Sequence, residues 1–135
     1  MGNDVIYNKI EIIERCLKRI NEVYAGNFEN LNDFTKQDSI VLNIQRACEA
    51  AIDLAMHIVS EKKLGMPQNS RDAFELLITN KLIDGKLAGK LMAMIGFRNI
   101  AVHNYQNLNL DIVREIIEKH LEDFRELIYQ INKIN

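Results

Sequence analysis

Apolar residues recur along the chain at alternating spacings of three and four, which is the period of an amphipathic α-helix. The first stripe of this kind predicts a helix whose apolar face is made of Ile6, Ile10, Ile13, Leu17, Ile20 and Tyr24. Asn3 is placed to cap the start of this helix, and Gly26 is placed to end it. The polar stretch 27–37 predicts a loop, from which three apolar side chains fold back on the core: Phe28, Leu31 and Phe34.

A second helix is expected from about Asp38 to Leu64, before the helix breakers Gly65 and Pro67. Its apolar positions cover more than one face, and they are Ile40, Val41, Ile44, Ala47, Cys48, Ala51, Leu54, Ala55, Ile58 and Val59. A helix that is apolar over a wide arc needs neighbours on several sides. We therefore expect this helix at the centre of the fold.

Three further helices complete the pattern. A short third helix begins at Asn69-Ser70 and carries Phe74, Leu77 and Ile78. Asp84 is placed to cap a fourth, which presents Leu87, Leu91, Met94 and Ile95. A last helix after residue 109 carries Val113, Ile117, His120, Phe124, Leu127 and Ile131. Long amphipathic helices with short connections predict an all-α, up-and-down helical bundle of four to five helices.

Apolar residues also occur off the main stripes of the first and last helices, at Ile12, Val23, Ile112, Ile116, Leu121 and Ile128. Two explanations are open. These side chains serve a subunit interface, or they belong to a core that needs a wide helix face.

Composition agrees with a helical protein of one domain. The chain has 135 residues, of which 47% are hydrophobic, so we expect a single domain over residues 1–135. A net charge of −2 excludes a surface that attracts polyanions everywhere, and any contact with nucleic acid must therefore be local. The start of the chain does not resemble a signal peptide, and no run of about 18 apolar residues occurs, so we expect a cytoplasmic protein without a membrane partner.

Side chains that could bind a metal are few and scattered. Cys16 and Cys48 fall on apolar helix positions without a further Cys or His at ligand spacing, which predicts two reduced, buried thiols. Asp53 and His57 are four residues apart and could be metal ligands, but an ion pair on the helix surface or a buried polar contact is the favoured interpretation. For His120, in the apolar seam of the last helix, we expect a neutral packed histidine or an interface contact.

Polar groups capable of chemistry are concentrated in one segment, from Gly96 to Tyr105. It contains Arg98, Asn99, His103 and Tyr105. On a regular helix Asn99 and His103 share a face, where the amide could fix the tautomer of the imidazole. Arg98 and Tyr105, seven residues apart, also share a face. Arg98 and His103 are five residues apart, about 140° around an ideal helix, and need not point the same way.

The offset between Arg98 and His103 has two explanations. Either the helix loosens near His103, or the working site is assembled where two copies of the segment meet across a two-fold axis. Cleaving RNA without a metal requires a base, an acid and positive charge on the phosphorane-like transition state. One chain supplies one imidazole here and a dimer supplies two, while Arg98 can hold the phosphate oxygens. The second explanation therefore predicts a homodimer.

The run Arg98-Asn99-Ile-Ala-Val-His103 resembles the signature of HEPN domains, and its extension to Tyr105 resembles more narrowly the HepT-like toxins. The likeness extends over essentially the whole chain, because the motif lies late, on the penultimate long helix of a predicted bundle. The resemblance implies a metal-independent endoribonuclease toxin of a type VII-like toxin–antitoxin system, which dimerises through the motif-bearing helices and has RNA, not DNA, as its substrate.

The resemblance also implies a partner and a role for each motif residue. Toxins of this kind are neutralised by a minimal nucleotidyltransferase antitoxin that attaches AMP to the motif tyrosine. Carried over by position, Arg98 and His103 are catalytic, Asn99 supports them, and Tyr105 is the AMPylation site. No metal or cofactor is implied.

Other interpretations of these residues stay open. A non-catalytic HEPN module would use the motif to bind nucleotide or to scaffold a nucleotidyltransferase. The motif side chains could also be ordinary surface and helix-end residues. Lys81, Lys86, Lys90 and Arg46 could line a path for RNA toward the motif, or they could be solvated side chains without a ligand.

Overall fold

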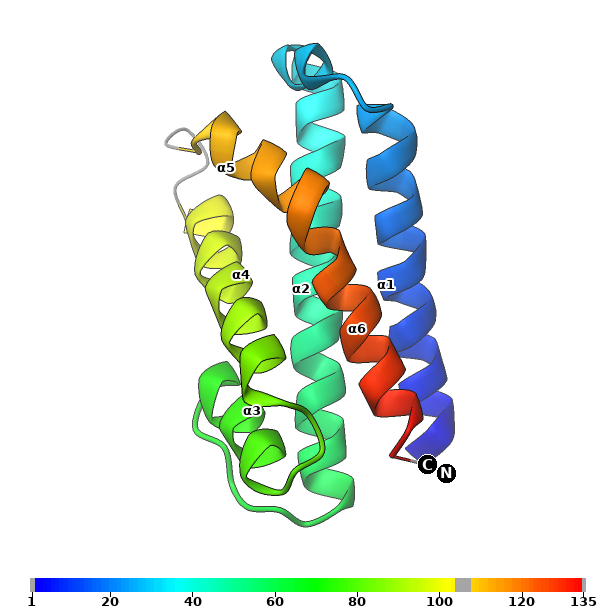
Figure 1. The fold of residues 1–135 in the computed structure, drawn as a ribbon, viewed down its shortest axis with the longest axis vertical. Coiled ribbons are helices and arrows are strands. Elements are labelled where there is room, and N and C mark those ends of the chain that lie inside the picture. Colours follow the sequence, from blue (N-terminus) through cyan, green and yellow to red (C-terminus); the bar gives the residue numbers. More distant parts are fainter. Residues whose placement is uncertain (1, 104–107, 135) are drawn as a thin grey trace.

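The chain folds into an up-and-down bundle. The computed structural model describes residues 2–103 and 108–134, and no strand occurs within these two ranges. The chain runs up α1, down α2, up α4 and back down through α5 and α6 (Figure 1). In chain order the elements are α1 (Gly2–Tyr24), the 3-10 helix η1 (Phe28–Asn32), α2 (Phe34–Glu61), α3 (Ser70–Thr79), α4 (Gly85–His103), α5 (Leu110–Glu115), the π-helical turn η3 (Ile116–His120) and α6 (Leu121–Asn132). The expected all-α bundle is confirmed.

Helix α2 lies at the centre of the bundle, as its wide apolar arc predicts. It contacts α1, η1, α3 and α4, while α6 crosses the bundle in contact with α4 and α1 (Figure 1). The large side chains that are fully buried between these helices are Phe74, Phe124, Ile13, Ile20, Leu31, Ile40, Ile44, Leu54, Ile58, Leu77, Leu127 and Ile131. Burying this apolar surface is the main favourable contribution to folding.

Short polar side chains determine where several helices begin. Asn69 Oδ1 accepts a hydrogen bond from the backbone N–H of Asp72 at 2.9 Å, at the start of α3. Asp84 Oδ1 accepts one from the backbone N–H of Leu87 at 2.7 Å, at the start of α4. Both caps satisfy N–H groups that have no partner inside the helix. The predicted starts of α3 and α4 are confirmed.

The predicted loop over 27–37 is wrong. Asn27 caps η1 and Asp33 caps α2, so the polar residues of this stretch start helices instead of interrupting them. As a result α2 begins at Phe34, whose side chain is 78% exposed and does not return to the core. Leu31 is fully buried and Phe28 is half-buried, as expected.

The other predicted ends of the first two helices also need correction. α1 begins at Gly2, so Asn3 lies inside the helix and not at its cap. Its C-terminal end agrees with the prediction, because Gly26 has a φ of 69°. α2 ends at Glu61, before the expected Leu64, because Lys63 adopts a left-handed φ of 54°.

The last helix contains a widened turn. η3 has the wider π-helical hydrogen bonding between α5 and α6, which shifts the faces of the residues that follow it. Ile116, Leu121 and Ile128 are buried, and Ile12 and Val23 pack partly against the same core. The wide-core explanation is therefore confirmed for these five residues. Ile112 differs, since 47% of it is exposed.

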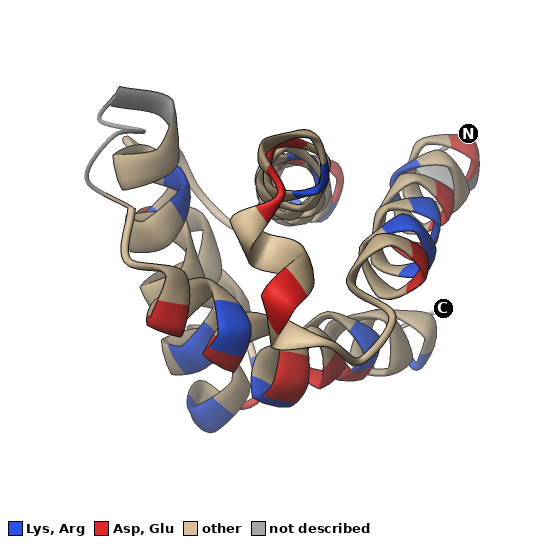
Figure 2. Cartoon of the chain, turned by 90° about the horizontal axis from the view of Figure 1, so that it is seen from above, with Lys and Arg blue, Asp and Glu red and all other residues tan. Residues whose placement is uncertain are grey.

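Basic and acidic residues are mixed over the helices and form no large area of one sign in the view of Figure 2. Helix α1, which carries the N-terminus, shows both signs along its outer side (Figure 2). None of the helices in the described part of the chain is long and apolar enough to cross a bilayer.

Candidate active site

Helix α4 carries the motif to one end of the bundle. It is α-helical from Gly85 through His103, its last residue. The side chain of His103 and the whole of Tyr105 lie outside the described residues, as do the predicted contacts of either with Asn99 or Arg98. Since the helix stays regular up to residue 103, local loosening within this range does not remove the angular offset between positions 98 and 103.

Arg98 faces the interior side of α4, toward α2. Its side chain is half-buried, and its Nε is fully buried with no hydrogen-bond partner among the described residues. A buried N–H of a charged group without an acceptor is unfavourable by about 1–3 kcal/mol or more. Such groups are uncommon in folded proteins, and a catalytic role or a bound ion is among their explanations. The buried Nε–H of Arg98 is a donor suited to an anionic oxygen.

The thiol of Cys48 on α2 lies close enough to feel the charge of Arg98. Burial raises the pKa of Cys48 to about 12, and the positive charge of Arg98 opposes this rise. The Sγ atom donates a weak hydrogen bond to the backbone carbonyl of Met94 at 3.7 Å. Burial also raises the pKa of Cys16, and both cysteines are free. The prediction of two reduced, buried thiols is confirmed.

Asn99, about 100° around α4 from Arg98, lies on an exposed side of the helix. Its neighbours on this side are small: Gly89, Ala93 and Gly96 are exposed, and Ile100 is 51% exposed. A Cβ atom added at Gly89 or Gly96 would meet nothing within 4 Å. Glycine inside a helix is less favourable than alanine by about 1 kcal/mol, and packing within one chain does not require it here. The exposed side of α4 therefore has the form of a surface that another backbone can approach closely.

The alternative metal ligands are engaged elsewhere. Asp53 pairs with Lys9 on α1 at 3.1 Å, and His57 Nε2 lies 3.3 Å from Glu61. This agrees with the ion-pair interpretation. Among the described residues, no three His, Cys, Asp or Glu side chains come together as a metal site.

His120, predicted to be a neutral packed histidine or an interface contact, is half-buried and contacts a carboxylate, and both interpretations stay predictions. Its Nδ1 lies 3.0 Å from Asp123 Oδ2, and the Asp123 residue is only 6% exposed. Lys90 on α4 approaches the other oxygen of this carboxylate at 3.8 Å. Asp123 was not predicted from the sequence, because a lone Asp on an apolar helix is normally solvated. Its spacing of three residues from His120 was the signal that could have indicated the contact.

The chain matches a family model described as Ribonuclease HepT-like over residues 13–131. It belongs to this family of HepT-like ribonucleases. The HepT-like chain is 55% identical to the mRNA nuclease HepT of Shewanella oneidensis over 126 residues, which are 93% of this chain and 95% of the relative. It is 28% identical to the tRNA nuclease HepT of Aphanizomenon flos-aquae over 129 residues, which are 95% and 88% of the two chains.

A solved structure extends the likeness to the fold. The tri-AMPylated HEPN toxin of Shewanella oneidensis in complex with its MNT antitoxin matches with a TM-score of 0.91 and 53% identity, over 96% of this chain and 98% of that one. The predicted resemblance to HEPN domains, and more narrowly to HepT, is confirmed. The catalytic roles of individual residues in this HepT-like chain remain predictions.

The buried Nε–H of Arg98 leads to a prediction about the free energy of unfolding. Arg98→Met removes a buried, unpaired N–H, so the free energy of unfolding should stay unchanged or rise by up to about 1 kcal/mol in urea denaturation. Arg114→Met is the matched control, because the Arg114 guanidinium contacts Glu118 at 3.3 Å and stacks 4.7 Å from the Phe28 ring centroid. It should lower the free energy of unfolding. A large loss of stability in Arg98→Met would mean that Arg98 is structural.

Proposed function

We propose that this chain is a metal-independent endoribonuclease toxin, formed by a single HEPN domain over residues 1–135. The observation that carries the proposal is the half-buried Arg98 on the motif helix, whose Nε lacks a partner. Support comes from the extensive identity with a HepT that is named an mRNA nuclease. Because its substrate is cellular RNA, we place the protein in the cytoplasm.

The proposed reaction is transfer of the phosphodiester to the neighbouring 2′-hydroxyl. The 2′-oxygen attacks phosphorus while the bond from phosphorus to the 5′-oxygen breaks. The His103 imidazole of one protomer accepts the 2′-hydroxyl proton, and the protonated His103 of the other donates a proton to the departing 5′-oxygen. Arg98 binds the non-bridging oxygens, whose negative charge grows in the transition state. The products are a 2′,3′-cyclic phosphate and a 5′-hydroxyl.

The homodimer in this proposal forms through the exposed side of α4. Gly89, Ala93 and Gly96 leave room for a second α4 to approach, and Asn99 lies on the same side. A two-fold axis there would combine residues of both motifs in one composite site. Positions 98 and 103 are about 140° apart around the helix. In a dimer, Arg98 of one protomer and His103 of the other can still act in the same site.

The proposed regulation is AMPylation by a minimal nucleotidyltransferase antitoxin. It is supported by the likeness to a tri-AMPylated HEPN toxin in complex with an MNT antitoxin. In this proposal Tyr105 accepts the AMP groups. Their negative charge and bulk, two residues from His103, would repel and obstruct the RNA phosphate. Asn99 has the supporting role of orienting the imidazole.

Substitution of the proposed acid and base tests the function directly. His103→Ala should lower the rate of RNA cleavage at least about 100-fold, since general acid–base catalysis contributes roughly 10²–10⁴. His57→Ala, in an ion pair on another helix, should cleave normally. Cleavage is measured on labelled RNA, and fold and dimer are checked by circular dichroism and light scattering. Unchanged cleavage in a folded His103→Ala dimer would favour the non-catalytic HEPN module.

A second substitution tests the composite site. Gly96→Leu should leave the protomer folded, because Gly96 is exposed and a Cβ added there meets nothing within 4 Å, but it should block close approach of the partner. We expect a monomer in light scattering and loss of RNA cleavage together. Ser60→Leu, at an exposed position of α2, is the control and should remain a dimer. An active Gly96→Leu monomer would contradict the composite site.

A third experiment tests the modification. On coexpression with a minimal nucleotidyltransferase, the intact mass should rise by one or more AMP units, and Tyr105→Phe should show no increase. The same variant should keep its ribonuclease activity in the presence of the antitoxin, because the acceptor hydroxyl is gone. An unchanged pattern of modification in Tyr105→Phe would place the acceptor elsewhere.

A further inference from the structure

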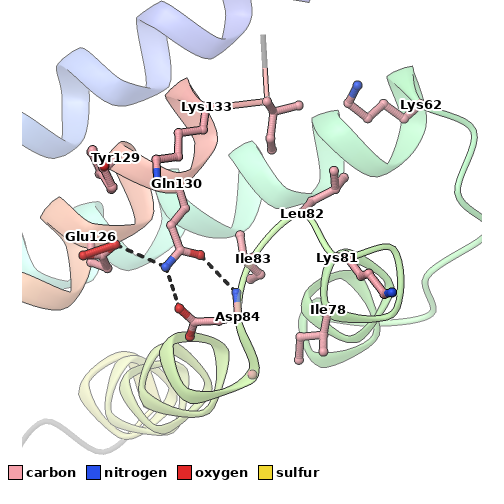
Figure 3. Close-up of a pocket in the computed structure, with 12 residues that line it drawn as sticks. Lys62, Ile78, Lys81, Leu82, Ile83, Asp84, Glu126, Tyr129, Gln130 and Lys133 are labelled. Carbon is pink, nitrogen blue, oxygen red and sulfur yellow. Dashed lines mark hydrogen bonds between the residues drawn. The ribbon is translucent and has the colours of Figure 1, made fainter.

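Three hollows follow one another along α4, each sharing lining residues with the next, and together they are called the groove below. The first, of about 800 Å³, lies between the connection from α3 to α4 and the end of α6 (Figure 3). The second, of about 520 Å³, shares Asp84, Glu126 and Tyr129 with it. The third, of about 460 Å³, shares Lys86 and Lys90 with the second. It is also lined by Gly89 and Ala93, so in the proposed dimer the α4 helix of the partner subunit borders this hollow.

The third hollow reaches Phe97, the residue before Arg98. From Gly85 to Arg98 the helix rises about 20 Å. A ligand in the groove would therefore extend well beyond the cleavage centre. We infer that this groove binds single-stranded RNA on one side of the cleaved phosphodiester, an inference that rests on the proposed ribonuclease function.

The far end of the groove combines an aromatic ring with amines. Tyr129 is 56% exposed, and Lys133 Nζ lies 4.4 Å from its ring centroid (Figure 3). Lys62 and Lys81 line the same hollow, and neither has an ion pair within the described part of the chain. Exposed aromatic rings stack on bases and lysines attract phosphates, which is the usual combination in single-strand binding sites. Lys81 also has a left-handed φ of 59°, an unfavourable backbone for a lysine.

The acidic groups along the groove are largely engaged with other protein groups. Asp84 Oδ2 accepts a hydrogen bond from Gln130 at 2.7 Å, and its other oxygen caps α4 (Figure 3). Glu126 accepts from the same amide at 3.2 Å, and Glu122 pairs with Arg125. Two more carboxylates line the groove: Asp123 lies 3.8 Å from Lys90, and Glu115 lies 4.0 Å from Lys119. The basic partners of Glu122, Asp123 and Glu115 offset part of the negative charge that would otherwise repel a phosphate.

The second and third hollows of the groove, which lie nearer the motif, combine lysines with apolar side chains. Lys86 and Lys90 lie one helical turn apart on α4, and Lys90 also approaches Asp123 at 3.8 Å. The wall beside them combines the apolar Phe97 and Ile116 with Glu115 and His120. Phosphates can follow the lysines while a base packs against the apolar wall next to Arg98. Of the four cations considered as an RNA path, Lys81, Lys86 and Lys90 line this groove. Arg46 lines a separate hollow between α1 and α2.

Binding of uncleavable RNA separates the groove from the catalytic chemistry. Fluorescein-labelled 2′-O-methyl RNAs of about 4 and about 12 nucleotides, within the range of known single-strand sites, are titrated with the dimer in anisotropy measurements at several salt concentrations. Tyr129→Ala should weaken binding of the longer RNA about tenfold. Lys81→Ala with Lys133→Ala should reduce the slope of log K against log salt by about 1.4. The shorter RNA should bind and, in its cleavable form, be cut as by the wild type.

Matched controls are available at residues that line none of the three hollows. Tyr7 on α1 is 59% exposed, so Tyr7→Ala removes a similarly exposed ring, and Lys18→Ala with Lys36→Ala removes two exposed lysines of α1 and α2. These variants should bind both RNAs as the wild type does. Equal losses in the controls, or wild-type affinity and salt slope in the groove variants, overturn the inference. Loss of antitoxin binding without loss of RNA binding overturns it too, since the groove would then be a protein interface.

The same data distinguish failure of the groove from failure of the proposed function. A wild-type dimer that cuts no RNA but whose affinity depends on Tyr129 contradicts only the nuclease. A dimer that cuts RNA while the groove variants bind normally contradicts only the groove.

Discussion

The regular geometry of α4 is the constraint on which the site depends. Each residue turns an α-helix by about 100°, so a continuous helix directs positions 98 and 103 to different sides. Arg98 lies on the side that faces α2, where its Nε is buried without an acceptor among the described residues. Asn99 uses the exposed side, among glycines and an alanine. One protomer therefore divides its motif between two faces, and the proposed dimer is the arrangement that joins them.

Two local features lower the stability of a single protomer, and both lie at the proposed functional surface. An unpaired buried guanidinium N–H and exposed glycines within a helix are each unfavourable by about 1 kcal/mol or more. The hydrophobic core around α2 is large enough to tolerate both, since it buries side chains from nearly every helix. Strained residues and buried polar groups without a partner are often found at functional sites.

The C-terminal helices form the other wall of the groove. The π-helical turn η3 changes the register between α5 and α6, so that Ile116 and Leu121 are buried and His120 meets the carboxylate of Asp123. On the other side of the turn, Tyr24 donates a hydrogen bond to Glu118 at 2.5 Å and links η3 to α1. The wall of the groove is thus held by contacts to α4 and to α1.

Much of the fold and the motif could be predicted from the sequence, because helix periodicity and capping depend on residues close together in the chain. The wide apolar arc of α2, the caps at Asn69 and Asp84, and the Arg98 to Tyr105 segment are all of this kind. The polar stretch 27–37 was misread because the same residues that favour loops, Asn27 and Asp33, also start helices. Only the tertiary structure decided that the Nε of Arg98 is buried with no partner among the described residues, that Asp123 contacts His120, and that lysines far apart in sequence line the same groove. Those facts depend on which helices pack together, and spacing along one helix does not contain that information.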